Sequence, residues 1–149
     1  MALLLSVGIV AGAASIVARG YTRPNVITDG WSSSWSTGSS TAAVELRLGN
    51  DSPQPIEIVG ATIVGADGSP LPYARVASMQ PLSMDGLLPD ATAAAIYSLP
   101  MTVEVDCATA LADSDPASVR SLLLHTTGTF PYHDQVIDGD FDVSGFCRS

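Results

Sequence analysis

Residues 41–64 read TAAVELRLGNDSPQPIEIVGATIV, a sequence with two strand patterns on either side of a turn. Apolar and charged side chains alternate from Ala43 to Leu48, which is typical of a strand with one buried face. The run GNDSP at 49–53 supplies turn residues, and residues 56–64 predict a second strand with a bulge at Gly60. Two strands joined by a short turn indicate antiparallel β-structure.

The chain beyond this stretch continues the pattern of short strands and turns. Further strands are expected over 73–77, 92–99, 101–107 and 119–126, followed by a terminal hairpin over 130–147. Pro100 leaves open whether 92–107 forms two strands or one kinked strand, and residues 80–90 are expected to be irregular. Turns at intervals of roughly 8–12 residues are typical of antiparallel sandwiches, so an all-β sandwich is predicted.

The run VELRLGNDSPQPIEIVG at 44–60, followed by LPDAT at 88–92, resembles bacterial immunoglobulin-like accessory domains. The chain also resembles small membrane-anchored envelope proteins of high-GC Gram-positive bacteria. It lacks the third-strand tryptophan of antibody domains, and its cysteines do not have the spacing of that family. The resemblance implies an immunoglobulin-like antiparallel β-sandwich over 41–107 and carries no active site.

The first 18 residues, MALLLSVGIVAGAASIVA, contain no charged side chain. As a helix they would cover roughly 25 Å of a bilayer. They are open to interpretation as a transmembrane anchor, a signal peptide cleaved before Ala14, or a buried helix of a soluble domain. The anchor is favoured because no basic side chain precedes the apolar run. The predicted plan is one N-terminal transmembrane helix (1–19), a Ser/Gly-rich linker (20–40) and a β-sandwich (41–149).

Two groups of residues near the N-terminus are candidates for docking a partner. Gly8, Gly12 and Ser15 share one face of the predicted helix, and such small residues let a second helix approach closely. Trp31 and Trp35 lie in the predicted linker. Their interpretations are a first strand packed on the domain, anchors for a partner protein, or an aromatic belt at the bilayer interface.

The two cysteines, Cys107 and Cys147, predict one disulfide, with two buried free thiols as the other interpretation. Their spacing excludes CxxC redox and zinc motifs. A disulfide favours an oxidising compartment, so the domain is expected on the extracytoplasmic side of the cell membrane. Arg19 and Arg23 follow the apolar segment and favour the opposite orientation.

The composition argues against nucleic-acid binding and against catalysis. A formal net charge of −9 repels nucleic acid and anionic lipid head groups. His125 and His133 are the two histidines, and no nucleophile elbow accompanies them, so neither an enzyme nor a cofactor is expected. Met79 and Met84 flank a proline-containing loop; they are too few for a copper site and are better explained by packing.

One acidic run is a candidate for calcium. Asp138, Asp140 and Asp142 alternate along the chain, and Asp134 is an additional candidate ligand. The EF-hand pattern fails because Val143 occupies the position that needs glycine. A turn after Asp138 followed by a solvent-facing strand explains the same residues without a metal.

Together these features predict a non-catalytic, membrane-anchored accessory subunit. Its helix would dock into a larger membrane-protein complex of the respiratory or secretion class, and its sandwich would cover an external face. The alternative is a free tethered or secreted envelope-binding domain that recognises a glycan, a peptide or a metal ion.

Overall fold

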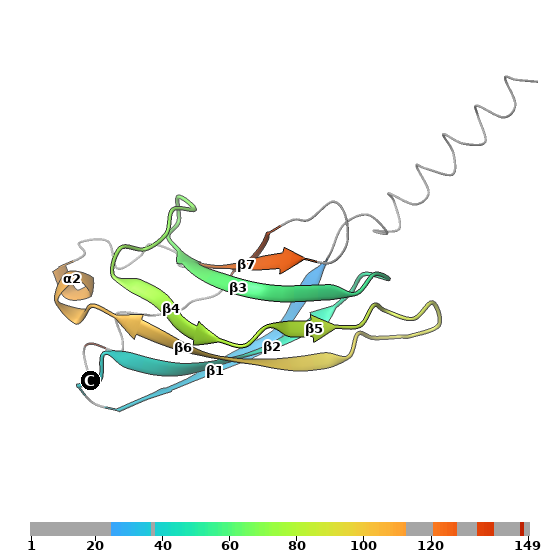
Figure 1. Cartoon of the computed structure of the whole chain (residues 1–149), viewed down its shortest axis with the longest axis horizontal. Coiled ribbons are helices and arrows are strands. Elements are labelled where there is room, and N and C mark those ends of the chain that lie inside the picture. The colour runs from blue at the N-terminus through green and yellow to red at the C-terminus, as the bar shows by residue number, and fades with distance from the viewer. Residues whose placement is uncertain (1–24, 37, 113–120, 128–133, 139–146, 148–149) are drawn as a thin grey trace, which may run out of the picture.

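The computed structural model describes residues 25–36, 38–112, 121–127 and 134–138 together with Cys147, and these residues form two four-stranded antiparallel sheets. The first sheet has the order β1-β2-β6-β4, with strands β1 (Val26–Trp35), β2 (Thr41–Asn50), β6 (Ile96–Val105) and β4 (Ala74–Met79). The second has the order β5-β3-β7-β8, with strands β5 (Leu82–Met84), β3 (Ile56–Val64), β7 (Ser121–Thr127) and β8 (Gln135–Asp138). A short helix, α2 (Cys107–Ala112), follows β6. Figure 1 shows β3 and β7 on one side of the sandwich and β1, β2 and β6 on the other.

The core lies between the two sheets and confirms the half-buried strand predicted from residues 43–48. Along β2, buried and exposed side chains alternate strictly from Thr41 to Leu48. Leu46 and Leu48 are fully buried in one cluster with Ile58 of β3 and Leu124 of β7. Burying a leucine side chain stabilises a fold by about 1.5–3 kcal/mol, so these inner faces supply the main attraction between the sheets.

The linker predicted over 20–40 is wrong for most of its length, because Val26–Trp35 is strand β1 of the first sheet. Trp31 pairs with Leu46 and Trp35 with Ala42, so both indoles lie on the core-facing side of the sheet. This confirms the interpretation of the tryptophans as part of a packed first strand. The β-propensity of the aromatic side chains and their spacing of four residues outweigh the Ser-rich composition.

Other strand predictions are confirmed with refinements. Residues 96–105 form one strand, β6, despite Pro100. The pairing of β6 with β4 ends at Met101, so Pro100 has no β4 residue opposite it. A proline is tolerated there because no backbone donor is needed on the β4 side. The register of β3 against β7 shifts between Ile58 and Gly60, as the predicted bulge requires. Residues 80–90 are not wholly irregular, because they include β5. The second strand of the predicted terminal hairpin lies outside the described residues.

The predicted disulfide between Cys107 and Cys147 is present, with Cα atoms 5.3 Å apart. It ties the first residue of α2 to the C-terminal region. No helix in the described part of the chain is long and apolar enough to cross a membrane. The anchor predicted over 1–19 lies outside the described residues.

Asp106 caps the N-terminus of α2. Its carboxylate accepts hydrogen bonds from the Ala108 amide at 3.1 Å, the Thr109 amide at 3.3 Å and the Thr109 hydroxyl at 2.8 Å. The Thr109 hydroxyl, followed by the Thr109 amide, lowers the pKa of the Asp106 carboxyl below its ordinary value of 3.8.

We expect acid to weaken this cap. A carboxyl whose pKa is lowered by folding adds stability above its unfolded pKa, and that stability is lost as the pH falls below 3.8 through the folded pKa. Asp106→Asn keeps a capping side chain but removes the charge. Urea unfolding at pH 7 and pH 3 should therefore show a smaller acid-induced loss of stability in Asp106→Asn than in the wild type. Equal losses in the two proteins would contradict the assignment.

Candidate functional site

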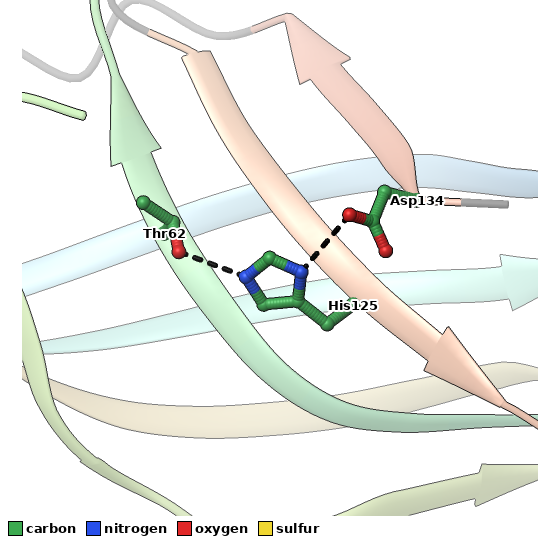
Figure 2. Close-up of polar contacts among 3 residues, drawn as sticks. All are labelled: Thr62, His125 and Asp134. Carbon is green, nitrogen blue, oxygen red and sulfur yellow. Dashed lines mark hydrogen bonds and ion pairs between the residues drawn. The ribbon is translucent and has the colours of Figure 1, made fainter. Parts of the chain in front are cut away.

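A hydroxyl, an imidazole and a carboxylate lie in line on the second sheet (Figure 2). Thr62 Oγ1 of β3 is 2.8 Å from His125 Nε2 of β7, and His125 Nδ1 is 3.1 Å from Asp134 Oδ2, just before β8. The register places Gly60 opposite His125, and a Cβ at Gly60 would lie 3.3 Å from the ring carbon Cδ2. The missing side chain at Gly60 therefore leaves room for the ring to lean towards Thr62.

The order of these groups is that of a hydrolytic triad, in which a hydroxyl contacts Nε2 and an acid contacts Nδ1. Acyl transfer also needs donors aimed at the developing oxyanion. The amides of β3 and β7 around Thr62 run within the sheet and pair with the opposite strand, so they do not project from the face that carries the hydroxyl. The cluster (Thr62, His125 and Asp134) connects β3, β7 and the residue that precedes β8.

Thr62→Val should lower the free energy of unfolding by about 1 kcal/mol, because it deletes one partly buried hydrogen bond while keeping the shape of the side chain. Thr102→Val, on the half-buried outer face of β6, is the matched control and should change stability by less than about 0.5 kcal/mol. Urea unfolding measures both, and the imidazole NMR resonances of His125 should shift in Thr62→Val alone. Equal stability losses in the two variants would show that the hydrogen bond contributes nothing specific.

The predicted docking residues are only partly described. Gly8, Gly12 and Ser15 lie outside the described residues. Trp31 and Trp35 lie on β1, a strand at the end of the first sheet, and keep 38% and 40% of their surface exposed. Both indoles lie on the core-facing side of β1 and still present part of their rings to solvent.

Only two of the candidate calcium ligands, Asp134 and Asp138, lie in the described part of the chain. Asp138 ends β8, whereas Asp140 and Asp142 lie outside the described residues. His133, which was considered only for catalysis, also lies outside them. Asp134 is engaged by His125. No group of three or more His, Cys, Asp or Glu side chains with metal-binding geometry occurs among the described residues. 

The two methionines considered for copper are packing residues. Met84 is 1% exposed in the core and Met79 packs against the same core cluster. The packing interpretation of these methionines is therefore confirmed.

A buried hydrogen-bond network around Asn50 was not predicted from the sequence. Asn50, which is 2% exposed, donates from Nδ2 to the Gln54 carbonyl at 2.6 Å and to the Asp85 carbonyl at 3.0 Å. Its Oδ1 accepts from the Ser52 amide at 3.0 Å and the Ser52 hydroxyl at 2.5 Å. The GNDSP run predicted a turn, but a contact to residue 85 depends on tertiary structure and leaves no local signal.

A shallow depression of about 580 Å³ crosses the outer face of the first sheet. Its lining is dominated by small and hydroxyl-bearing residues, including Ser32, Ser34, Ser78 and Thr102. Glu45 is the single charged residue in the lining, and Ser98 donates a hydrogen bond to it at 2.7 Å. The lining includes no aromatic ring on which a sugar could stack.

No family model matches the chain, and no curated protein matches it. Among solved structures, the chain is similar to one described as the crystal structure of FixG-related protein from Vibrio parahaemolyticus. The similarity covers 76% of this chain and 92% of that one, at 12% sequence identity and a TM-score of 0.43. A similarity this weak supports no argument about the present chain.

Proposed function

We propose that the chain is a non-catalytic accessory subunit of a larger membrane-protein complex. The apolar residues 1–18 of the helix predicted over 1–19 would anchor it, and an immunoglobulin-like sandwich would lie on the extracytoplasmic side. The observation that carries the proposal is the start of β1 at Val26, so that only residues 19–25 separate the apolar segment from the folded domain.

This short connection limits where the domain can be. Fully extended, residues 19–25 reach about 25 Å at roughly 3.5 Å per residue. An anchored sandwich on such a tether stays at the membrane surface and beside whatever membrane protein holds its helix. A free binding domain that samples the envelope needs a long flexible linker, such as the one predicted over 20–40. Most of that linker is strand β1.

Two further features support the proposal. The disulfide between Cys107 and Cys147 favours an oxidising compartment, consistent with an extracytoplasmic domain. The order β1-β2-β6-β4 in one sheet and β3-β7-β8 in the other corresponds to the ABED and CFG sheets of immunoglobulin constant domains, with β5 as an added strand beside β3. Such sandwiches carry many functions, so the fold adds no chemistry of its own.

Purification of the full chain through a C-terminal tag, from native membranes in a mild detergent, tests this function. We expect other membrane subunits to co-purify in fixed stoichiometry. Replacing Gly8 and Gly12 by isoleucine keeps the segment apolar but widens its face, so the chain should stay in the membrane and lose its partners. A monomeric wild-type chain would contradict the proposal, and a soluble product beginning near Ala14 would favour the secreted alternative.

A further inference from the structure

The chain enters the sandwich at one end, which we name the tether end. Val26 at the start of β1 pairs with Asn50 at the end of β2, and Gly49 pairs with Ile96 at the start of β6. The connection 85–95 between β5 and β6 lies at this same end, because the Asp85 carbonyl accepts from Asn50. In Figure 1 this connection extends beyond the strands, away from α2.

The tether end carries a group of exposed apolar side chains. Leu88, Ile96 and Ile27 are 67%, 43% and 37% exposed. Ile27 and Ile96 flank Gly49 on the outer face of the first sheet. A Cβ on Gly49 would lie 3.0 Å from Ile27 Cγ1 and 3.2 Å from Ala94 Cβ, so these two side chains close over the glycine. Leu88 lies at the same end, because the Leu87 amide donates to the Ser52 carbonyl. We name Ile27, Ala94 and Ile96, which meet around Gly49, together with Leu88 the apolar patch.

Three exposed carboxylates lie at the same end of the sandwich as the apolar patch. Asp51, Asp85 and Asp90 are exposed in the turn and the connection at this end. The two described arginines form the ion pairs Arg47–Asp29 and Arg75–Glu104. Both described arginines are therefore used elsewhere, and none of the three carboxylates at the tether end pairs with a described cation.

We infer that the apolar patch docks on an extracytoplasmic surface of the partner membrane subunit that is apolar at its centre and flanked by Arg or Lys. The inference rests on the proposed function, since it needs the tether to hold this end near the membrane. Residues 19–25 reach about 25 Å, so the tether end is the part of the sandwich that meets a neighbouring subunit first. A basic protein surface complements the three carboxylates.

The test compares full-length variants in mild detergent by native electrophoresis. Leu88→Asp combined with Ile96→Asp should reduce the fraction of chain in the complex about tenfold, because both charges enter an apolar contact. Leu111→Asp is the matched control: Leu111 is 55% exposed on α2, at the other end of the sandwich, and its substitution should leave the complex intact. Asp85→Asn with Asp90→Asn should weaken the complex and reduce its sensitivity to salt.

Urea unfolding followed by tryptophan fluorescence confirms that each variant is folded. A photo-crosslinking amino acid at position 88 should form an adduct with the subunit that co-purifies with the wild type, and the same probe at position 111 should not. A complex that survives both aspartates, or an adduct with lipid at position 88, overturns the docking inference and leaves the accessory function standing. A wild-type chain that is monomeric overturns the accessory function itself.

Discussion

Replacing Cys107 and Cys147 by serine should lower the free energy of unfolding by about 4 kcal/mol. The disulfide spans a sequence separation of 40 residues, and closing a loop of that length removes about this much chain entropy from the unfolded state. Total stabilities of small domains are about 5–15 kcal/mol, so the loss is a large share of the whole. The bond also fixes α2 to Cys147 near the C-terminus.

Urea unfolding of the double serine variant, compared with the wild type with and without reductant, measures the effect. Reduced wild type should match the variant, and reductant should not change the variant further. A loss below about 1 kcal/mol would show that the unfolded chain is already compact around this loop. A thiol-alkylating reagent added to isolated membranes should label Cys107 and Cys147 only after reduction if the domain lies in an oxidising compartment.

The alternating pattern of residues 43–48 was sufficient to predict β2, because a half-buried strand must place every second side chain in the core. The bulge at Gly60 was predictable for a similar reason, since glycine interrupts an otherwise regular run. The start of the domain was not predicted correctly. Ser-rich composition resembles a linker, and only pairing with β2 shows that Trp31 and Trp35 face the core.

Which side chains meet on the sheets could not be predicted from the sequence. Thr62 and His125 are 63 residues apart, and they meet only because the bulge sets the register of β3 against β7. A shift of one residue would move either side chain to the opposite face. The apolar patch depends in the same way on two strand pairings that meet at Gly49. His125 lies in the strand that was predicted over 119–126, but its partners could not be predicted.

Asn50→Ala should lower the free energy of unfolding by about 3 kcal/mol, since alanine leaves the buried Ser52 amide and the Asp85 carbonyl without the partner that Asn50 supplies. The Gln54 carbonyl is less affected because the Ser52 hydroxyl also reaches it, at 3.2 Å. Asn25→Ala is the matched control: its amide makes only an exposed 3.4 Å contact with Asp51, so the change should stay within about 0.5 kcal/mol. Urea unfolding measures both variants.

A second substitution tests the same connection from the other side. A Cβ at Gly86 would lie 2.2 Å from the Pro53 carbonyl oxygen, so Gly86→Ala must move backbone and should also destabilise the fold, by about 1–3 kcal/mol. Because Asn50 and Gly86 hold the same two segments together, the double variant should lose less than the sum of the single losses. Simple additivity would show that the two contacts act independently.

The Asn50 network also holds the segment that carries Leu88. Asn50 donates a hydrogen bond to the Asp85 carbonyl, and the Leu87 amide donates to the Ser52 carbonyl at 2.7 Å. The segment just before Leu88 is therefore bonded to both Asn50 and Ser52. Asn50→Ala should therefore loosen the connection 85–95 before it unfolds the core. Hydrogen exchange of the Leu87 amide should speed up in Asn50→Ala more than exchange in β2 and β6. Uniform acceleration across the sandwich would instead mean that the network supports only the global fold.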